Sequence, residues 1–139
     1  MISDFTSGKL KYMLYKPSDE SNLPLVVVLH GSGEIGSSLS KLKKREPYLS
    51  LNNGKCKPNA CIMMPQLPKN NWIYWKNTLH QLILQVAKDN QCDEKRISIT
   101  GHSLGANGTM DFLFAFQFYQ LQIILPHCQI TMQRGILAV

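Results

Sequence analysis

Three short segments predicted to be strands constrain the fold of this chain more than any other feature. They read LVVVLH at residues 25–30, ACIMMPQ at 60–66 and ISIT at 97–100. The first is a continuous apolar run rich in valine, which is typical of a strand buried on both faces of a parallel sheet. Apolar residues recur at helical spacing over about residues 77–90 and again after residue 103. The alternation predicts an α/β fold with a mostly parallel sheet flanked by helices.

The other segments add less. LKYMLYKP, at residues 10–17, alternates and then meets Pro17, which predicts an edge strand that stops there. Residues 38–50 have room for a short helix. A chain of 139 residues is long enough for one domain with a real core but not comfortably for two. We therefore expect a single domain over residues 1–139.

The charge is unevenly placed. The net charge is +6, and part of it comes from Lys41, Lys43, Lys44 and Arg45. Such a run indicates either a patch for nucleic acid or anionic surfaces, or a solvated helix face. No interleaved aromatic residues or nucleic-acid motif accompany it. We therefore expect a solvated face and no nucleic-acid partner.

Cysteine spacing and the N-terminus predict little beyond a globular domain. Cys56 and Cys61 have no second Cys or His pair at a zinc-like spacing, so we expect free thiols, no metal and no cofactor. The N-terminus has no apolar segment typical of a secretory signal, which predicts a cytoplasmic location. No apolar run is long enough to predict a membrane span.

The chemistry centres on Gly101-His102-Ser103-Leu104-Gly105, a G-x-S-x-G motif between a β-branched strand and a helical pattern. On a sharp strand-to-helix turn, the two glycines let strand and helix approach closely and the serine hydroxyl is lifted above the strand end. The amide of Leu104 would then lie at a helix N-terminus, where unpaired N–H groups and the dipole favour an oxyanion. Ser103 is the candidate nucleophile.

A second motif, LHGSGE at residues 29–34, ends the first buried strand. An amide from Gly31 or Ser32 could pair with that of Leu104, because an oxyanion hole usually needs two aimed donors. As an isolated motif it is equally typical of a simple turn. We expect His102, beside the serine, to be a packing residue rather than a general base, and His80 to be structural or exposed.

Together these motifs resemble the α/β-hydrolases of the small carboxylesterase type, which include phospholipase/carboxylesterase-like and polyhydroxybutyrate-depolymerase-like esterases. The matching pieces are PLVVVLHGSGEIG, ACIMMPQLP followed by Trp72, and LHQLILQVAKDNQCDEKRISITGHSLGANGTMDFLFAF, over about residues 10–116. The resemblance implies a partial α/β-hydrolase fold and hydrolysis of a small-molecule ester through an acyl-serine. It makes Ser103 the nucleophile, and the amides of Leu104 and of Gly31 or Ser32 the oxyanion donors.

The acid and the histidine of the catalytic triad are not clearly identified in this sequence. In this fold the acid and the histidine follow the serine along the chain. Asp111 comes too early to be the acid, no Asp or Glu follows it, and the only later histidine is His127, a weak candidate base. Residues 117–139 form an atypical tail, and 112–133 contain no charged residue. The resemblance implies further C-terminal strands, so we expect either a short natural variant or a reading frame that shifts near residue 116, and we favour the second.

Three functions therefore stay open. The first is a serine ester hydrolase in an incomplete, weakly active or inactive form. The second is a non-catalytic α/β-hydrolase-like binding module, and the third is a fragment of a prolyl-oligopeptidase-type peptidase.

The tail also bears on the sheet edge. LQIILPHC, at residues 121–128, could form a next strand. An uncovered sheet edge would favour self-association.

Overall fold

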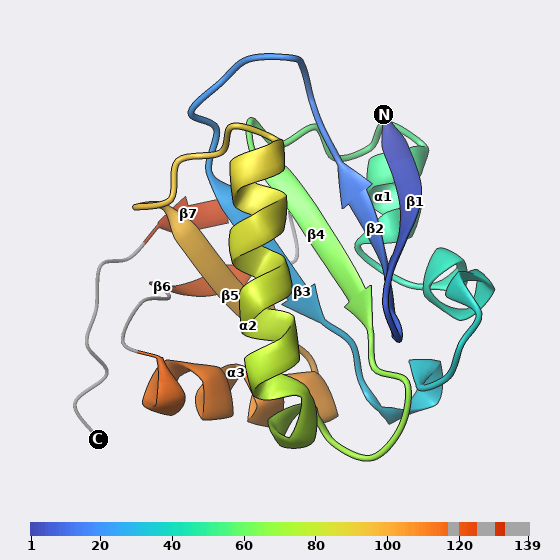
Figure 1. Ribbon diagram of the computed structural model, residues 1–139. Coiled ribbons are helices and arrows are strands. Elements are labelled where there is room, and N and C mark those ends of the chain that lie inside the picture. The colour runs from blue at the N-terminus through green and yellow to red at the C-terminus, as the bar shows by residue number, and fades with distance from the viewer. Residues whose placement is uncertain (117–119, 125–129, 133–139) are drawn as a thin grey trace.

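The computed structural model describes residues 1–116, 120–124 and 130–132. Strands and helices alternate through most of the chain, as Figure 1 shows. The elements are β1 (Ile2–Ser7), β2 (Leu10–Tyr15), β3 (Leu25–Leu29), the 3-10 helices η1 (Ser32–Glu34) and η2 (Leu39–Lys44), α1 (Tyr48–Asn52), β4 (Cys61–Gln66), α2 (Trp72–Asp89), β5 (Ile97–Gly101), α3 (Leu104–Ala115), β6 (Gln120–Ile124) and β7 (Ile130–Met132).

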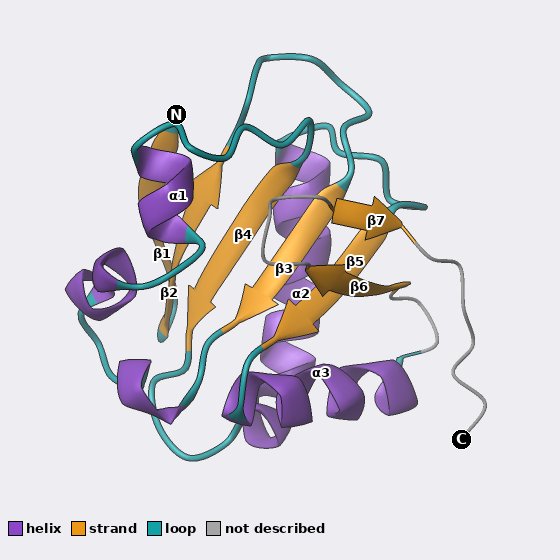
Figure 2. Cartoon of the chain, turned by 180° about the vertical axis from the view of Figure 1, so that it is seen from behind, coloured by secondary structure: helices purple, strands orange, loops and turns teal. Residues whose placement is uncertain are grey.

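The strands form one mixed sheet in the order β1-β2-β4-β3-β5-β6-β7. Strands β4, β3, β5 and β6 are parallel, while β1, β2 and β7 pair antiparallel with their neighbours. Figure 2 shows α2 behind the sheet, α1 in front of it, and α3 across the carboxyl ends of β3 and β5. Sites in open α/β sheets form at these carboxyl ends, so the position of α3 is the one that matters for function.

Both faces of the central strands are buried, as the apolar runs predict. On β3, Val27 packs into the cluster with α2, and the adjacent Val26 packs into the cluster on the α1 side. Met63 and Met64 divide in the same way on β4. Because neighbouring side chains on a strand point to opposite faces, a strand with helices on both sides needs apolar residues throughout.

Several boundaries differ from the sequence predictions. The chain has an additional strand, β1, so β2 is not an edge strand, and α2 begins at Trp72 instead of near residue 77. Residues 38–50 hold η2 and the start of α1 instead of one helix, because Pro47 lacks the N–H that a continuous helix needs. The segment interpreted as a possible next strand, residues 121–128, overlaps β6, which pairs parallel with β5 through Ser98↔Gln120 and Ile99↔Leu121.

The cysteines only partly match the expectation of free thiols. Cys61 and Cys92 are free and buried. Cys56 is disulfide-bonded, so the expectation is wrong at that position. Cys128 lies outside the described residues. Among the residues that the structure covers, no group of three or more His, Cys, Asp or Glu is placed to hold a metal ion.

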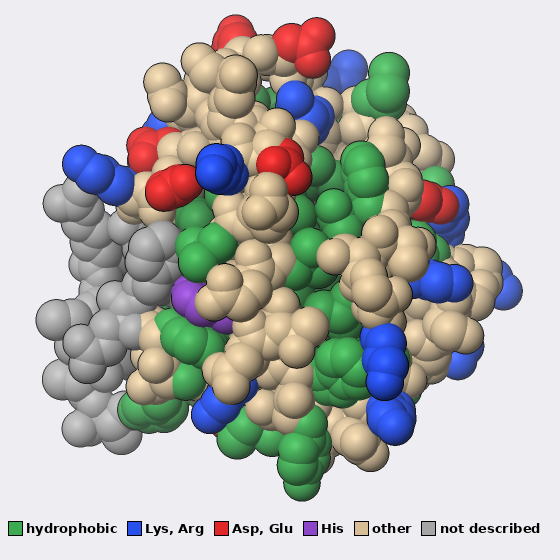
Figure 3. All heavy atoms as spheres, viewed as in Figure 1, with side chains coloured by type: hydrophobic (Ala, Val, Ile, Leu, Met, Phe, Trp, Pro, Cys, Tyr) green, Lys and Arg blue, Asp and Glu red, His purple; other side chains and the backbone are tan. Residues whose placement is uncertain are grey.

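Several large apolar side chains are exposed on the surface. Figure 3 shows exposed hydrophobic side chains near the lower end of one face, where α3 and the first turn of α2 lie. Tyr74 and Phe114 are the most exposed of the large apolar side chains on these two helices. In the clustered basic run, Lys43 pairs with Asp4 at 2.6 Å and Lys41 donates to the Ile35 carbonyl. In the described part of the chain, no helix is long and apolar enough to cross a membrane.

Candidate active site

Ser103 lies on the turn between β5 and α3, as the motif predicts. Its backbone has φ 54° and ψ −118°. A non-glycine residue in this region carries strain of about 1–3 kcal/mol, which the surrounding structure must hold in place. Two backbone hydrogen bonds of 2.9 Å close the turn, from Gly105 N to His102 O and from Ala106 N to Ser103 O. The serine side chain itself is exposed.

The two flanking glycines are required by close backbone packing. A Cβ added to Gly105 would lie 2.0 Å from the Leu29 carbonyl oxygen, and one added to Gly101 would lie 2.1 Å from the Gly105 carbonyl oxygen. Real Cβ atoms do not approach this closely, so both positions exclude any larger residue. The absence of these side chains lets the first turn of α3 pack directly on the end of β3.

The structure brings the second motif to the same place. A Cβ built on Gly31 would lie 3.6 Å from the Cβ of Ser103 and 3.5 Å from the His102 carbonyl oxygen. Ser32, the next residue, begins η1 and is exposed. Leu104 is the first residue of α3, where no side chain caps the helix and the first amides lack intrahelical partners. His127, the weak candidate base, lies outside the described residues.

His30 organises the loop beneath the serine, a role that the sequence did not predict. Its Nε2 accepts the Leu67 amide at 2.8 Å, so the proton is on Nδ1, which donates to the Gly31 carbonyl at 2.6 Å. The indole of Trp72 donates to the His30 carbonyl at 3.1 Å and lies edge-on to the imidazole. Burial lowers the pKa of His30, against the opposing effects of the Gly31 hydrogen bond and the Glu34 charge. His30 is thus held neutral and connects three segments.

Glu34 is the acidic residue nearest this loop, and it too was missed. Its side chain is 12% exposed and pairs with Arg45 at 3.0 Å, while His30 Nδ1 lies 3.9 Å away. Gln66 holds the backbone in place by donating to the carbonyls of Glu34 and Ser38, both at 2.9 Å. The only signal in the sequence was the spacing of four between His30 and Glu34, which is too common to be informative.

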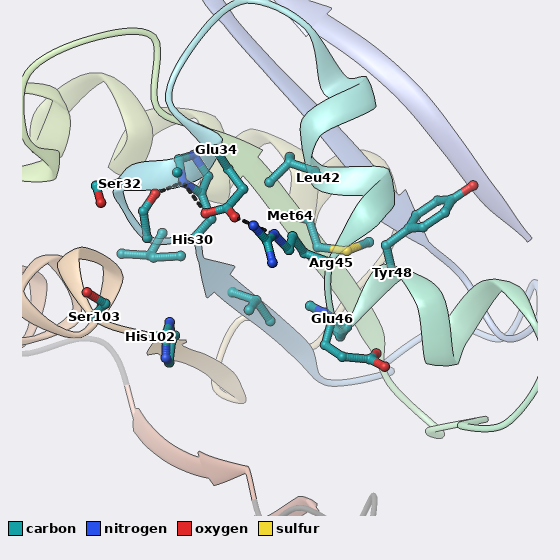
Figure 4. Close-up of a pocket in the computed structure, with 15 residues that line it drawn as sticks. His30, Ser32, Glu34, Leu42, Arg45, Glu46, Tyr48, Met64, His102 and Ser103 are labelled. Carbon is teal, nitrogen blue, oxygen red and sulfur yellow. Dashed lines mark hydrogen bonds and ion pairs between the residues drawn. The ribbon is translucent and has the colours of Figure 1, made fainter.

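A pocket of about 540 Å³ opens beside Ser103. Figure 4 shows Ser103 and His102 on one side of the pocket, and Leu42, Met64 and Tyr48 on the other. Glu34 and Arg45 lie between these two groups in the same view. This volume is within the range of about 300–1,000 Å³ typical of small-molecule sites.

Neither of the other two described histidines, His102 and His80, is hydrogen-bonded to Ser103. His102 is exposed and lines the pocket, so the expectation of a packing residue is wrong. His80 is half-buried and stacks on Phe116 with a centroid distance of 4.0 Å. Within the described part of the chain, no hydrogen bond joins Ser103 to a histidine. Asp111 lies within α3, as expected, and cannot be on a later strand.

Comparison with known proteins identifies the fold. No protein-family model matches the sequence, and no curated protein sequence matches it. Solved structures of esterases do match: a thermostable esterase (TM-score 0.64, 22% identity, 86% of this chain and 39% of that one), the carboxylesterase EstE1 cloned from a metagenomic library (0.61, 18%, 87% and 46%) and the acetyl xylan esterase from Aspergillus awamori (0.66, 16%, 94% and 57%).

These similarities assign the chain to a fold class. The chain has part of the α/β-hydrolase fold, with a mixed sheet and flanking helices. It spans between 39% and 57% of the lengths of the three structures named above. At identities below 25%, the likeness concerns the fold, and the chemistry has to be argued from the site itself.

Proposed function

We propose that this chain carries the nucleophile and the oxyanion-binding part of a serine hydrolase that acts on carboxylic esters. The observation that carries the proposal is the strained backbone of Ser103, which lies beside Gly31 at the carboxyl ends of β3 and β5. Strain at an exposed serine, fixed by glycines on both sides, is typical of a nucleophile held at a sharp turn.

In the proposed reaction, Ser103 Oγ attacks the ester carbonyl carbon and gives up its proton. The carbonyl oxygen becomes an oxyanion that accepts hydrogen bonds from the amide of Leu104 and that of Gly31 or Ser32. Collapse expels the alcohol and leaves an acyl-serine, which water then hydrolyses. A base must accept this proton and later return it, and His127 is the first candidate for that base.

We expect a low rate of ester hydrolysis if no histidine is hydrogen-bonded to Ser103. Oxyanion stabilisation and binding alone leave a residual acceleration on the order of 10³ to 10⁴ over water. A phosphonofluoridate probe tests the nucleophile without requiring turnover: the Ser103 Oγ–P bond forms, the P–F bond breaks, and the proton passes to water. We expect one adduct, mapped by mass spectrometry to the peptide containing Ser103.

Two serine variants make this experiment specific. The Ser103→Ala variant should lose the adduct, while Ser32→Ala keeps the backbone amide of residue 32 and should retain it. An adduct of equal size and rate in Ser103→Ala would overturn the proposal, as would complete absence of labelling in the folded wild type.

The absence of a histidine hydrogen bond to Ser103 within the described residues favours a second candidate, a binding module that keeps the turn as a scaffold. The two functions separate in hydrolysis of a short activated ester. A turnover that depends on Ser103 supports the hydrolase, and stoichiometric binding without any Ser103-dependent reaction supports the binding module.

A further inference from the structure

We propose that the pocket beside Ser103 binds the apolar substituent of an uncharged ester, and that Val28 and Met64 determine how long that substituent can be. This inference rests on the proposed function, because it takes Ser103 as the reacting group. It adds a substrate class and two specificity-determining residues to that function.

The apolar lining comes from one face of the sheet and the segment that covers it. Val28 of β3 and Met64 of β4 belong to the cluster on the α1 side of the sheet. Leu42 of η2 and Tyr48 of α1 line the same pocket and belong to the same cluster. Ser103, Gly31 and Ser32 line the same pocket. A group attached to the reacting carbon can therefore extend from the serine onto an apolar surface.

The charged residues of the pocket disfavour an anionic substituent. Arg45 is the cation among the described lining residues, and its Nε is already paired with Glu34 at 3.0 Å. Glu46 adds a second carboxylate, whose Oε2 accepts the Ser50 amide at 3.0 Å. A carboxylate on the substrate would meet two carboxylates and one guanidinium that is already paired. A neutral hydrocarbon chain avoids this repulsion.

Substitutions at Val28 and at Met64 should change the preferred length of the substrate chain in opposite directions. Val28 is half-buried on the strand that leads to the oxyanion loop, so a phenylalanine there adds volume to the pocket space near the serine. Figure 4 places Met64 on the side of the pocket away from Ser103, so its replacement by alanine lengthens the available space. Val28→Phe should therefore shorten the preferred chain, and Met64→Ala should lengthen it.

The experiment measures the rate at which p-nitrophenyl alkylphosphonates label Ser103. The Ser103 Oγ–P bond forms, p-nitrophenolate leaves, and the serine proton passes to solvent. One series lengthens the alkyl chain on phosphorus, which stands for the acyl group. A second lengthens the alkoxy chain, which stands for the alcohol. A third ends the chain in a carboxylate.

For the wild type we expect the labelling rate to rise about fourfold per added methylene, the gain for burying one CH₂ group, and then to level off. The rise should occur in one of the first two series, which identifies the acyl or the alcohol side, and should be lost in the carboxylate series. Val28→Phe should level off at a shorter chain and Met64→Ala at a longer one. Leu84→Phe, a half-buried position on α2 away from the pocket, should keep the wild-type profile.

The outcomes separate this inference from the proposed function. If no probe labels Ser103, the proposed function fails. If the shortest probe labels Ser103 but the rate does not depend on chain length, the pocket assignment fails and the nucleophile remains. A carboxylate series as fast as the neutral one also overturns the assignment. If a variant does not unfold cooperatively, the wild-type series alone decides.

Discussion

At the scale of single residues, the backbone of Ser103 combines a positive φ of 54° with a ψ of −118°. Glycine adopts positive φ readily, whereas serine and alanine do not. We expect Ser103→Gly to be more stable than Ser103→Ala by about 1 kcal/mol, since relief of the strain outweighs the entropy that glycine adds to the unfolded chain. Denaturant unfolding of both variants measures this difference. An alanine variant as stable as the glycine variant would mean that the turn carries no strain.

Gly31 gives a second test at this scale. An added methyl would make ordinary contacts of 3.5–3.6 Å with the turn, so Gly31→Ala should fold, but the methyl would occupy the space beside the nucleophile. We expect at least a roughly tenfold slower phosphonylation of Ser103, equivalent to about 1.4 kcal/mol in the barrier. Gly33→Ala is the matched control, because a Cβ there has no neighbour within 4 Å. Equal rates for the two variants would place the reacting group elsewhere.

His30 predicts a pH dependence of stability. Because burial lowers its pKa in the folded state below 6.5, the unfolded chain binds the proton more readily than the folded one. This contribution to stability is fully present above the unfolded pKa and is lost as pH falls through the folded pKa of His30. We expect the thermal midpoint to fall from pH 7 to pH 5, and to fall less in His30→Gln. A slope unchanged by this substitution would show that the effect comes from groups other than His30.

The sequence predicted the position of the candidate nucleophile well because its geometry is local. A strand, two glycines and a helix within one short segment determine where Ser103 and Leu104 lie. The contacts of Glu34 with Arg45 and of His30 with Leu67 join segments separated along the chain. No local pattern encodes such contacts. The prediction for His102 was wrong because exposure at a turn depends on which elements cover it.

At the scale of the elements, α3 packs closely on α2 because Gly108 of α3 has no side chain. A Cβ added to Gly108 would lie 2.7 Å from Trp72 Cβ, and Trp72 is only 1% exposed. We expect Gly108→Ala to destabilise the protein by about 1–3 kcal/mol through overpacking, although alanine favours a helix by about 1 kcal/mol over glycine. Asn107→Ala, an exposed neighbour on α3, should be neutral or slightly stabilising. Chemical denaturation distinguishes them, and a stabilised Gly108→Ala would contradict the tight packing.

The elements that the sequence predicted are those with a strong hydrophobic pattern. Strands β3, β4 and β5 are almost fully buried; β3 is continuously apolar, and the polar residues Gln66 of β4 and Ser98 of β5 are buried with their apolar neighbours. Strand β1 was missed because four of its six residues are exposed and an edge strand needs no apolar face. The first turn of α2 was missed because Ile73 and Tyr74 are exposed apolar residues, which break the amphipathic pattern.

At the scale of the whole molecule, the sheet ends in two different edges. Strand β1 forms one edge, and its Asp4 pairs with Lys43. Strand β7 forms the other edge, beyond β6, so β5 does not end the sheet. Charged side chains protect an edge strand from pairing with another chain. The sequence of β7, ITM, has no charge, whereas β1 carries Asp4.

We therefore expect the protein to self-associate through the β7 edge. Uncharged, β-branched segments favour intermolecular pairing, and the net charge of +6 opposes it only over about 8 Å at physiological salt. Size exclusion with light scattering should show species larger than a monomer. Thr131→Lys on β7 should shift them toward monomer, while Ser7→Lys on β1 adds the same charge to the opposite edge and should not. An equal shift in both variants would make net charge the cause, and a wild-type monomer at all concentrations would contradict edge pairing altogether.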